Sequence, residues 1–203
     1  MSIEIKISKR PISYKYAINF LQKRVKDIKN KKCNELLWVL EHPTTFTAGI
    51  RSEKKEILDK RINIISTNRG GKITLHNPGQ KIIYFVLDLN NRKKDLRKLI
   101  STIEKSIIEF LNFYDLKGIA DRKNIGVWVN KRKIAAIGIK VSRWIAYHGC
   151  SININNNLKK YLKIAPCGLD NNKITSILNE KKIIKKNNNK KLINIFLKNF
   201  KNF

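Results

Sequence analysis

The most informative stretch of this chain is Arg69-Gly70-Gly71-Lys72-Ile73-Thr74-Leu75-His76-Asn77-Pro78-Gly79-Gln80. It lies between two apolar segments, 62–66 and 82–89, that have the composition of strands. Paired glycines after a strand let the backbone turn sharply, and they let a ligand approach main-chain amides that a side chain would shield. A hairpin turn alone would not require the preceding arginine, or Thr74 and His76 at alternating positions. The stretch therefore predicts a ligand-binding site held between two strands.

Outside this stretch the chain alternates between helices and strands, without internal repeats. The helices are expected at 14–30, 94–113, 174–186 and 191–203, the second of them with apolar residues at helical spacing. The strands are expected at 36–42, 125–129, 133–141 and 145–154, with a hairpin turn at 130–132. Three segments are expected to be irregular: 42–49 as a loop, 158–164 as a connector and the Asn/Lys run 185–191 as a solvated link. In the first helix, the residues expected on one apolar face are Tyr16, Phe20, Val25 and Ile28.

A length of 203 residues with 42% hydrophobic residues indicates one globular domain spanning residues 1–203. No apolar run approaches the roughly 20 residues that span a bilayer, and the N-terminal residues lack the apolar centre of a secretion signal. We therefore expect a cytoplasmic protein without a membrane segment. The three cysteines have neither CxxC spacing nor a matching histidine pattern, which argues against a disulfide framework and against a zinc site. Nothing in the sequence indicates another metal or a nucleotide.

The formal net charge of +29 at pH 7 would in general point to nucleic acid. Here the excess of lysine accompanies heavy use of isoleucine and asparagine, and A/T-rich codons encode all three amino acids. Nucleotide bias in the genome gives the same charge, and no RNP pattern, helix-turn-helix signature or zinc finger is present. We expect no nucleic-acid partner, although a basic surface would speed the encounter with an acidic protein.

A second candidate feature is Cys167, which lies in the Pro-Cys-Gly segment 166–168 and is therefore expected on an exposed corner. A thiol reacts as the thiolate, and because its ordinary pKa is near 8.5 it needs a nearby cation or hydrogen-bond donor. Lys133 is a candidate for that cation, since it begins a strand whose other residues are apolar. The alternative for Lys133 is a solvent-facing hairpin lysine. The other cysteines have simpler interpretations, because Cys33 lies in a polar stretch and Cys150 is a small side chain on a buried strand.

Together these segments resemble the lipoyl(octanoyl) transferase family, over a region that runs from about residue 42 to residue 175. The motifs that carry the resemblance are Arg-Gly-Gly-x-x-Thr-x-His (69–76), Pro-Gly-Gln (78–80), Lys-Ile-x-x-x-Gly (133–138), Tyr-His-Gly (147–149), Asn-x-Asn (153–155) and Pro-Cys-Gly (166–168). The resemblance implies an α+β fold, with helices flanking a mostly antiparallel or mixed central sheet, similar to the catalytic domains of biotin and lipoate protein ligases. It also implies an acyltransferase that moves octanoyl from octanoyl-acyl carrier protein to a lysine ε-amine of lipoyl domains, in lipoate biosynthesis.

The resemblance assigns roles where residues match. Cys167 corresponds to the residue that carries the acyl group as a thioester, and Lys133 to the lysine that lowers the pKa of that cysteine. The residues that correspond to substrate-binding stretches are Arg69, Gly70, Gly71, Lys72, Ile73, Thr74, Leu75, His76, Ala136, Ile137, Gly138, Gly149, Cys150 and Ser151. The implied acceptors are the lipoyl domains of 2-oxoacid dehydrogenase E2 subunits and the glycine cleavage H protein, and no cofactor is implied. One departure is Asn77, where the family usually has glycine; asparagine tolerates positive φ, so the turn can survive.

Two details of the site follow from the residues themselves. His76 either shares in proton transfer or is a structural histidine that is hydrogen-bonded to the backbone of the groove. A saturated acyl chain needs an apolar tunnel, and its expected walls are Ile73, Leu75, Ile137 and the strand around Val141.

Two other classes of protein are alternatives. An ATP-dependent lipoate or biotin protein ligase would share the sheet, the glycine stretch and the lysine, but would form an adenylate and need no cysteine nucleophile. A basic nucleic-acid-binding or scaffold protein would bind unrelated DNA or RNA in a salt-sensitive manner. Replacing Cys167 by serine or alanine separates the enzymes, because only the thioester-forming transferase should lose activity.

Overall fold

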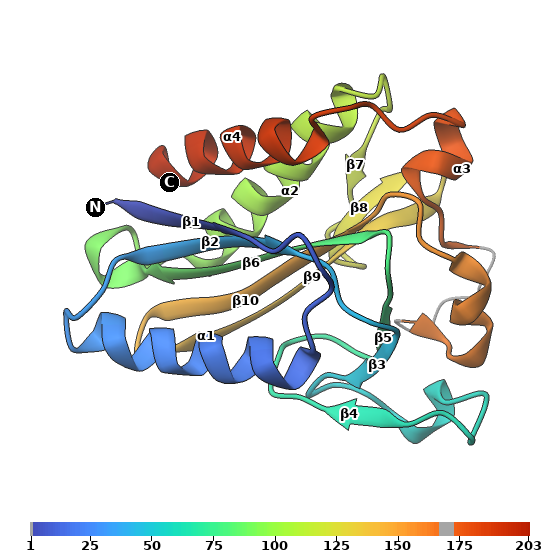
Figure 1. The fold of residues 1–203 in the computed structure, drawn as a ribbon, viewed down its shortest axis with the longest axis horizontal. Helices are drawn as coiled ribbons and strands as arrows, with labels where there is room; N and C mark the ends of the chain where they lie inside the picture. Colours follow the sequence, from blue (N-terminus) through green and yellow to red (C-terminus); the bar gives the residue numbers. More distant parts are fainter. Residues whose placement is uncertain (1, 167–172) are drawn as a thin grey trace.

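The computed structural model of the chain describes residues 2–166 and 173–203. A seven-stranded sheet with the strand order β1-β2-β6-β10-β9-β8-β7 forms its centre (Figure 1). The strands are β1 (Ile3–Ile7), β2 (Glu35–Leu40), β6 (Gln80–Asp88), β7 (Ile119–Ala120), β8 (Gly126–Val129), β9 (Arg132–Ser142) and β10 (Ile145–Asn153). Neighbouring strands are antiparallel, except that β1 pairs in parallel with β2. The mixed, mostly antiparallel sheet predicted from the sequence is confirmed.

Helices cover both faces of this sheet (Figure 1). The helix α1 (Tyr14–Lys29) lies on one face, and α2 (Leu96–Asn112) and α4 (Asn188–Lys201) lie together on the other. Alternate side chains of β6 enter the two apolar cores: Tyr84 packs in the core under α1, and Phe85 packs in the core under α2 and α4. Because both faces are covered, the strand has a continuous apolar sequence rather than an alternating one.

A second sheet, of three strands, contains the end of the glycine-rich stretch. Its strands are β3 (Thr45–Ala48), β4 (Ile64–Ser66) and β5 (Thr74–His76), in the order β4-β3-β5. The prediction of a loop over 42–49 is therefore wrong, because β3 pairs with β4 on one side and with β5 on the other. The paired glycines connect β4 to β5 within this sheet, and the following turn carries the chain into β6 of the large sheet.

The helices α1 and α2 and the hairpin of β8 and β9 lie where the sequence predicts them. Asn130 and Lys131 both have positive φ, 49° and 61°, which is typical of the tight turn that joins β8 to β9. The side chain of Ser13 caps α1 by accepting the main-chain N–H of Tyr16 at 3.2 Å. The predicted apolar face of α1 is wrong at Tyr16, which is exposed. Of the other three predicted residues, Ile28 is buried, and Phe20 and Val25 are partly buried against the core on this face. Tyr14, Ala17 and Leu21 are also buried there.

The C-terminal third departs further from the prediction. The helix expected at 174–186 is only α3 (Ile177–Lys181), because Lys182 adopts the left-handed conformation that ends it. The link expected at 185–191 is wrong in its second half, since α4 begins at Asn188. Short 3-10 helices complete the fold: η1 (Lys54–Glu56), η2 (Leu89–Asn91) and η3 (Leu158–Lys163). Within the described residues, none of the helices has both the length and the apolar character that crossing a bilayer requires.

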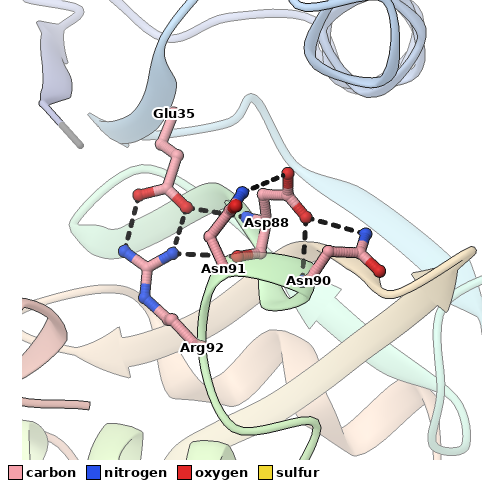
Figure 2. Close-up of polar contacts among 5 residues, drawn as sticks. All are labelled: Glu35, Asp88, Asn90, Asn91 and Arg92. Carbon is pink, nitrogen blue, oxygen red and sulfur yellow. Dashed lines mark hydrogen bonds and ion pairs between the residues drawn. The ribbon is translucent and has the colours of Figure 1, made fainter.

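A buried ion pair joins the start of β2 to the turn that follows β6 (Figure 2). Glu35 pairs with Arg92, and Nη2 of Arg92 lies 2.6 Å from Oε2 of Glu35. Glu35 also accepts the main-chain N–H of Asp88 at 2.7 Å, and Arg92 donates to the main-chain oxygen of Asp88 at 3.1 Å. The carboxylate of Asp88 accepts hydrogen bonds from Asn90 and Asn91 (Figure 2). These contacts fix η2 and thereby the direction in which α2 leaves the sheet.

Candidate active site

One cavity of about 320 Å³ lies between the glycine-rich stretch, strands β9 and β10, and the turn before β8. The residues predicted for the site that line it are Arg69, Gly70, Gly71, Lys72, Ile73, Thr74, His76, Lys133, Ala136, Ile137, Gly138, Gly149, Cys150 and Ser151. Leu75 does not line it, because Leu75 points to the opposite side of β5 and packs in a separate apolar cluster with Phe46 and Tyr161. Val141 is also absent from the lining. Cys167 lies outside the described residues.

Two glycines on adjacent strands make room for this cavity. Gly138 of β9 is paired directly with Gly149 of β10, so that no side chain projects from either position. A Cβ on Gly149 would lie 1.9 Å from the main-chain oxygen of Ile83, and a Cβ on Gly138 would lie 3.0 Å from that of Gly70. Gly70 also donates its N–H to the main-chain oxygen of Ile139 at 3.1 Å. The close approach of the glycine-rich stretch to β9 therefore depends on the missing side chain at Gly138, whereas the missing side chain at Gly149 allows β10 to pair closely with β6.

Arg69 organises the glycine-rich stretch from within. Its guanidinium donates to the main-chain oxygens of Gly70 at 3.1 Å and Lys72 at 2.9 Å. It also donates to the main-chain oxygen of Thr47 at 2.9 Å and to the hydroxyl of Thr47 at 2.8 Å. These bonds tie the turn to β3 and place a largely buried positive charge behind the cavity.

Lys133 is buried, with only 6% of its surface exposed, so it is not a solvent-facing hairpin lysine. Its ammonium nitrogen lies 5.6 Å from the centre of the Trp128 ring, a cation–π distance. Gly126 makes space for the side chain, since a Cβ there would lie 2.7 Å from Cε of Lys133. The main-chain oxygen of Lys133 accepts the N–H of Thr175 at 2.9 Å. Ile174 and Thr175, which follow the segment that contains Cys167, therefore lie directly beside Lys133.

All three histidines of the chain lie in one buried cluster of rings, in which His76 and His148 line the cavity. The rings of His42 and His76 are 5.6 Å apart, and Tyr84 lies 5.6 Å from His42 and 6.4 Å from His148. Burial lowers the pKa of His42 to about 4 and those of His76 and His148 to about 3, and the charge of Arg69 contributes to the last two. The imidazoles are therefore neutral near pH 7 and act as hydrogen-bonding groups rather than as cations.

The arrangement suits an acyl group. The cavity lining includes the apolar residues Ile73, Ile82 and Ile137, together with Lys133 and the glycines of the glycine-rich stretch. Such a combination can hold a hydrocarbon chain and stabilise an anion at its polar end.

Comparison with known proteins decides the family. Residues 13–201 match the family described as lipoyl protein ligase A/B catalytic domain. The chain is 42% identical over 191 residues to an octanoyltransferase of Bartonella tribocorum, covering 87% of this chain and 78% of that protein. It is 43% identical over 181 residues to an octanoyltransferase of Ehrlichia chaffeensis, covering 86% and 85%. The chain belongs to this octanoyltransferase family, and it is a transferase enzyme.

Solved structures agree on the fold. A putative lipoate protein ligase from T. acidophilum with bound lipoic acid has a TM-score of 0.80 at 11% sequence identity, covering 99% of this chain and 87% of that one. A biotin protein ligase from Aquifex aeolicus in complex with biotin and ATP has a TM-score of 0.59 at 15% identity, covering 98% and 71%. The predicted likeness of the fold to lipoate and biotin ligase catalytic domains is confirmed.

Within this octanoyltransferase fold, Cys150 lines the cavity and is largely buried. It is 4% exposed in the middle of β10, and burial raises the pKa of its thiol well above the ordinary range. Its sulfur is therefore a protonated thiol near neutral pH, as the interpretation of a small buried side chain requires.

Sequence reasoning missed several residues that line the cavity of this octanoyltransferase. They are Arg51, Ile82, Tyr84, Ile100, Lys123, Asn124, Ile125, Ile139 and His148. His148 could have been found, because it lies in the Tyr-His-Gly motif and only an unusual backbone brings it to the site. Its φ of 70° turns the ring onto the Tyr147 ring at 4.8 Å, and Nε2 lies 2.8 Å from Oδ1 of Asn68. The left-handed backbone in the middle of a strand is typical of functional sites.

Proposed function

We propose that the chain transfers an octanoyl group from octanoyl-acyl carrier protein to the lysine ε-amine of lipoyl domains in the cytoplasm, through a thioester on Cys167. The acceptors would be the lipoyl domains of 2-oxoacid dehydrogenase E2 subunits and the glycine cleavage H protein. The observation that carries the proposal is the convergence of Lys133, the glycine-rich stretch and the facing glycines of β9 and β10 on one apolar cavity, in a chain about 40% identical to octanoyltransferases.

In the first half of the reaction, the thiolate of Cys167 attacks the carbonyl carbon of the donor thioester. A carbon–sulfur bond to the enzyme forms, the bond to the carrier breaks, and the carrier sulfur leaves as a thiolate that takes up a proton. The Lys133 ammonium supports the ionised cysteine, and its burial at 6% exposure removes water that would screen the two charges. Main-chain amides of the glycine-rich stretch are candidates for the donors to the oxyanion.

In the second half, the neutral amine of the acceptor lysine attacks the enzyme thioester. The carbon–nitrogen bond forms, the carbon–sulfur bond breaks with Cys167 leaving as a thiolate, and the attacking nitrogen loses one proton to the solvent. His76 does not hold that proton, because burial lowers its pKa to about 3. The sequence leaves open proton transfer or a hydrogen bond to the groove backbone for His76, and the bond that its ring makes is instead to the side chain of Gln80, at 2.8 Å.

An ATP-dependent ligase is the second candidate function, because solved ligases share the fold. These two solved ligases are only 11% and 15% identical in sequence to this chain, so they show a shared fold and nothing more. The octanoyltransferase relatives are far closer in sequence, and we therefore favour the transferase.

The decisive experiment is mass spectrometry of the purified protein after incubation with octanoyl-acyl carrier protein. One octanoyl group should appear on the wild type and on Cys33→Ala, and none on Cys167→Ser. Octanoylation of a lipoyl domain should follow without ATP. Transfer that survives in Cys167→Ser and depends on octanoate plus ATP would identify a ligase instead.

A further inference from the structure

The amide of Gln80 has a single orientation in this structure. Gln80 is 1% exposed at the start of β6, and its Nε2 contacts three oxygen atoms. These are Oδ1 of Asn153 at 2.9 Å, the hydroxyl of Tyr161 at 3.0 Å and the main-chain oxygen of Leu75 at 3.2 Å. The main-chain oxygen is an acceptor only, and the Tyr161 hydroxyl itself donates to that same oxygen at 3.2 Å. The end of the amide that faces them must therefore be the NH₂ group, and Oε1 must face away.

That orientation determines the tautomer of His76. Oε1 of Gln80 lies 2.8 Å from Nδ1 of His76 and can only accept, so Nδ1 carries the hydrogen. The other ring nitrogen, Nε2, then has a lone pair. No residue that the structure describes donates a hydrogen bond to Nε2, and His76 is one of the residues that line the cavity. The ring therefore offers the cavity an acceptor of hydrogen bonds.

Asn153 connects this arrangement to Lys133. It lies directly opposite Gln80 in the pairing of β10 with β6, and it is 5% exposed. While its Oδ1 accepts from Gln80, its Nδ2 donates to the main-chain oxygen of Thr175 at 2.9 Å. Thr175 in turn donates its N–H to the main-chain oxygen of Lys133. One line of buried hydrogen bonds thus runs from the ring of His76 to the backbone of the lysine.

We propose that Gln80, held by Asn153, is a positioning residue that fixes His76 with a hydrogen on Nδ1, so that Nε2 accepts a hydrogen bond from the attacking amine of the acceptor lysine. The inference rests on the proposed function and adds to it the group that orients the second substrate. An amine nitrogen that donates to Nε2 keeps its lone pair free to point elsewhere, toward the thioester carbon. The bond is a neutral one, and no proton is transferred to the ring.

The surroundings of His76 keep it neutral. The groups that face the ring are Tyr14 from α1, stacked at 5.9 Å, His42 after β2, Arg69 from the glycine-rich stretch and His148 from β10. Burial among these rings and the charge of Arg69 both oppose protonation of His76. A neutral acceptor is the state that an incoming ammonium or amine requires, because a protonated ring would repel it.

The first test is the tautomer itself. Nitrogen-15 spectra of the imidazole rings at pH 7 are simple, because the chain has three histidines. His76, assigned through its loss in His76→Phe, should show a protonated Nδ1 and an unprotonated Nε2. In Gln80→Leu the ring should become a mixture of tautomers. A wild-type ring protonated on Nε2 would overturn the proposal, whatever the reaction proves to be.

The second test separates the two half-reactions by rapid quenching. Gln80→Leu should slow transfer from preformed octanoyl-enzyme to a lipoyl domain about tenfold, the equivalent of one hydrogen bond. Acylation by octanoyl-acyl carrier protein should change less than twofold. Gln80→Glu should give a second half-reaction that weakens as the pH falls from 8 to 6, because a carboxylate beside Nδ1 raises the pKa of the ring.

The matched control is Asn199→Leu, which also removes a buried carboxamide, bonded to Ser106 on the far side of the sheet. Its thermal stability should fall as in Gln80→Leu, without a selective loss of amine transfer. Equal slowing of both half-reactions in Gln80→Leu would show a merely structural role. A wild-type protein that forms no octanoyl-enzyme would instead overturn the proposed function, and with it the assignment of the amine.

Discussion

The main-chain N–H of Thr175 donates to the main-chain oxygen of Lys133 at 2.9 Å. A parallel bridge between Ile174 and Lys133 accompanies this bond. On the other side of the same segment, Ala165 donates its N–H to the main-chain oxygen of Glu56 at 2.8 Å. The chain is therefore anchored to β9 and to η1 on the two sides of the segment that contains Cys167, and one anchor is the backbone of the candidate catalytic lysine.

Replacing Lys133 by methionine should abolish most of the activity while leaving the fold intact. Methionine retains the apolar stem, but it removes the charge that is proposed to support the thiolate, and such a loss typically slows a reaction by about 10²–10⁴-fold. The rate of octanoyl-enzyme formation, followed by mass spectrometry, measures the effect. Lys117→Met, at an exposed position, should acylate at the wild-type rate. Normal acylation of Lys133→Met would remove Lys133 from the mechanism.

The pair formed by Glu35 and Arg92 should be a strong local contributor to stability. Glu35 is almost completely buried, so Arg92→Ala would leave its carboxylate unpaired at a cost of about 3–5 kcal/mol in the free energy of unfolding. Lys105→Ala, which breaks the exposed pair with Glu109, should cost at most about 0.5 kcal/mol. Urea denaturation of both variants makes the comparison. Similar costs for the two would show that the burial of Glu35 does not matter.

Stability should fall as the pH drops below about 6.5. The folded pKa values of His42, His76 and His148, at about 4, 3 and 3, lie below the ordinary value of a histidine in the unfolded chain. Between these limits the unfolded state binds more protons, so each histidine lowers the free energy of unfolding by up to about 1.4 kcal/mol per pH unit. Above pH 7 both states are neutral and the effect vanishes.

Urea denaturation at constant ionic strength between pH 7 and pH 5 tests this dependence. The carboxylates with strongly lowered pKa values, Glu53 at about 2 and Asp59 still lower, do not titrate in that window. His42→Asn should reduce the slope by the contribution of one histidine. A free energy of unfolding that stays constant from pH 7 to pH 5 would contradict the burial of neutral imidazoles.

Gly149→Ala should prevent normal folding. The added Cβ would lie 1.9 Å from the main-chain oxygen of Ile83, and backbone cannot move aside without breaking the pairing of β10 with β6. We expect a loss of more than about 3 kcal/mol, as for other overpacked interiors. Gly71→Ala is the control: it has a positive φ of 90° but no contact shorter than 3.5 Å, and should cost only about 1–2 kcal/mol. Thermal unfolding of the two variants ranks them.

Much of the central sheet follows from sequence, whereas only β4 of the small sheet is predicted as a strand. Long apolar runs such as 82–89 and the turn at Asn130 can be recognised from the local sequence alone. β3 has no such local pattern, because Thr45–Ala48 is short and follows a proline, and only its partners β4 and β5 make it a strand. β1 is likewise a short segment that depends on its pairing with β2. Tertiary pairing of this kind is invisible to local patterns.

Most of the residues predicted for the site line one cavity in the structure, and the exceptions have physical reasons. Leu75 lies between Thr74 and His76 on a strand, so the period of two sends it to the other face. That error was avoidable from the alternation itself. Tyr84 and Ile82 could not have been assigned from sequence, because they belong to a continuously apolar strand in which no local pattern separates cavity-lining residues from core residues.

The line of bonds through Gln80, Asn153 and Thr175 has an evolutionary consequence. Gln80 and Asn153 contribute their side-chain amides to this line, whereas Thr175 contributes only main-chain atoms that any residue would supply. Both amides are buried, so a change at one alone leaves a polar atom of the other without its partner. Homologous chains should accordingly vary at positions 80 and 153 in concert, and grafting one of the two from a distant relative should damage the recipient more than grafting both.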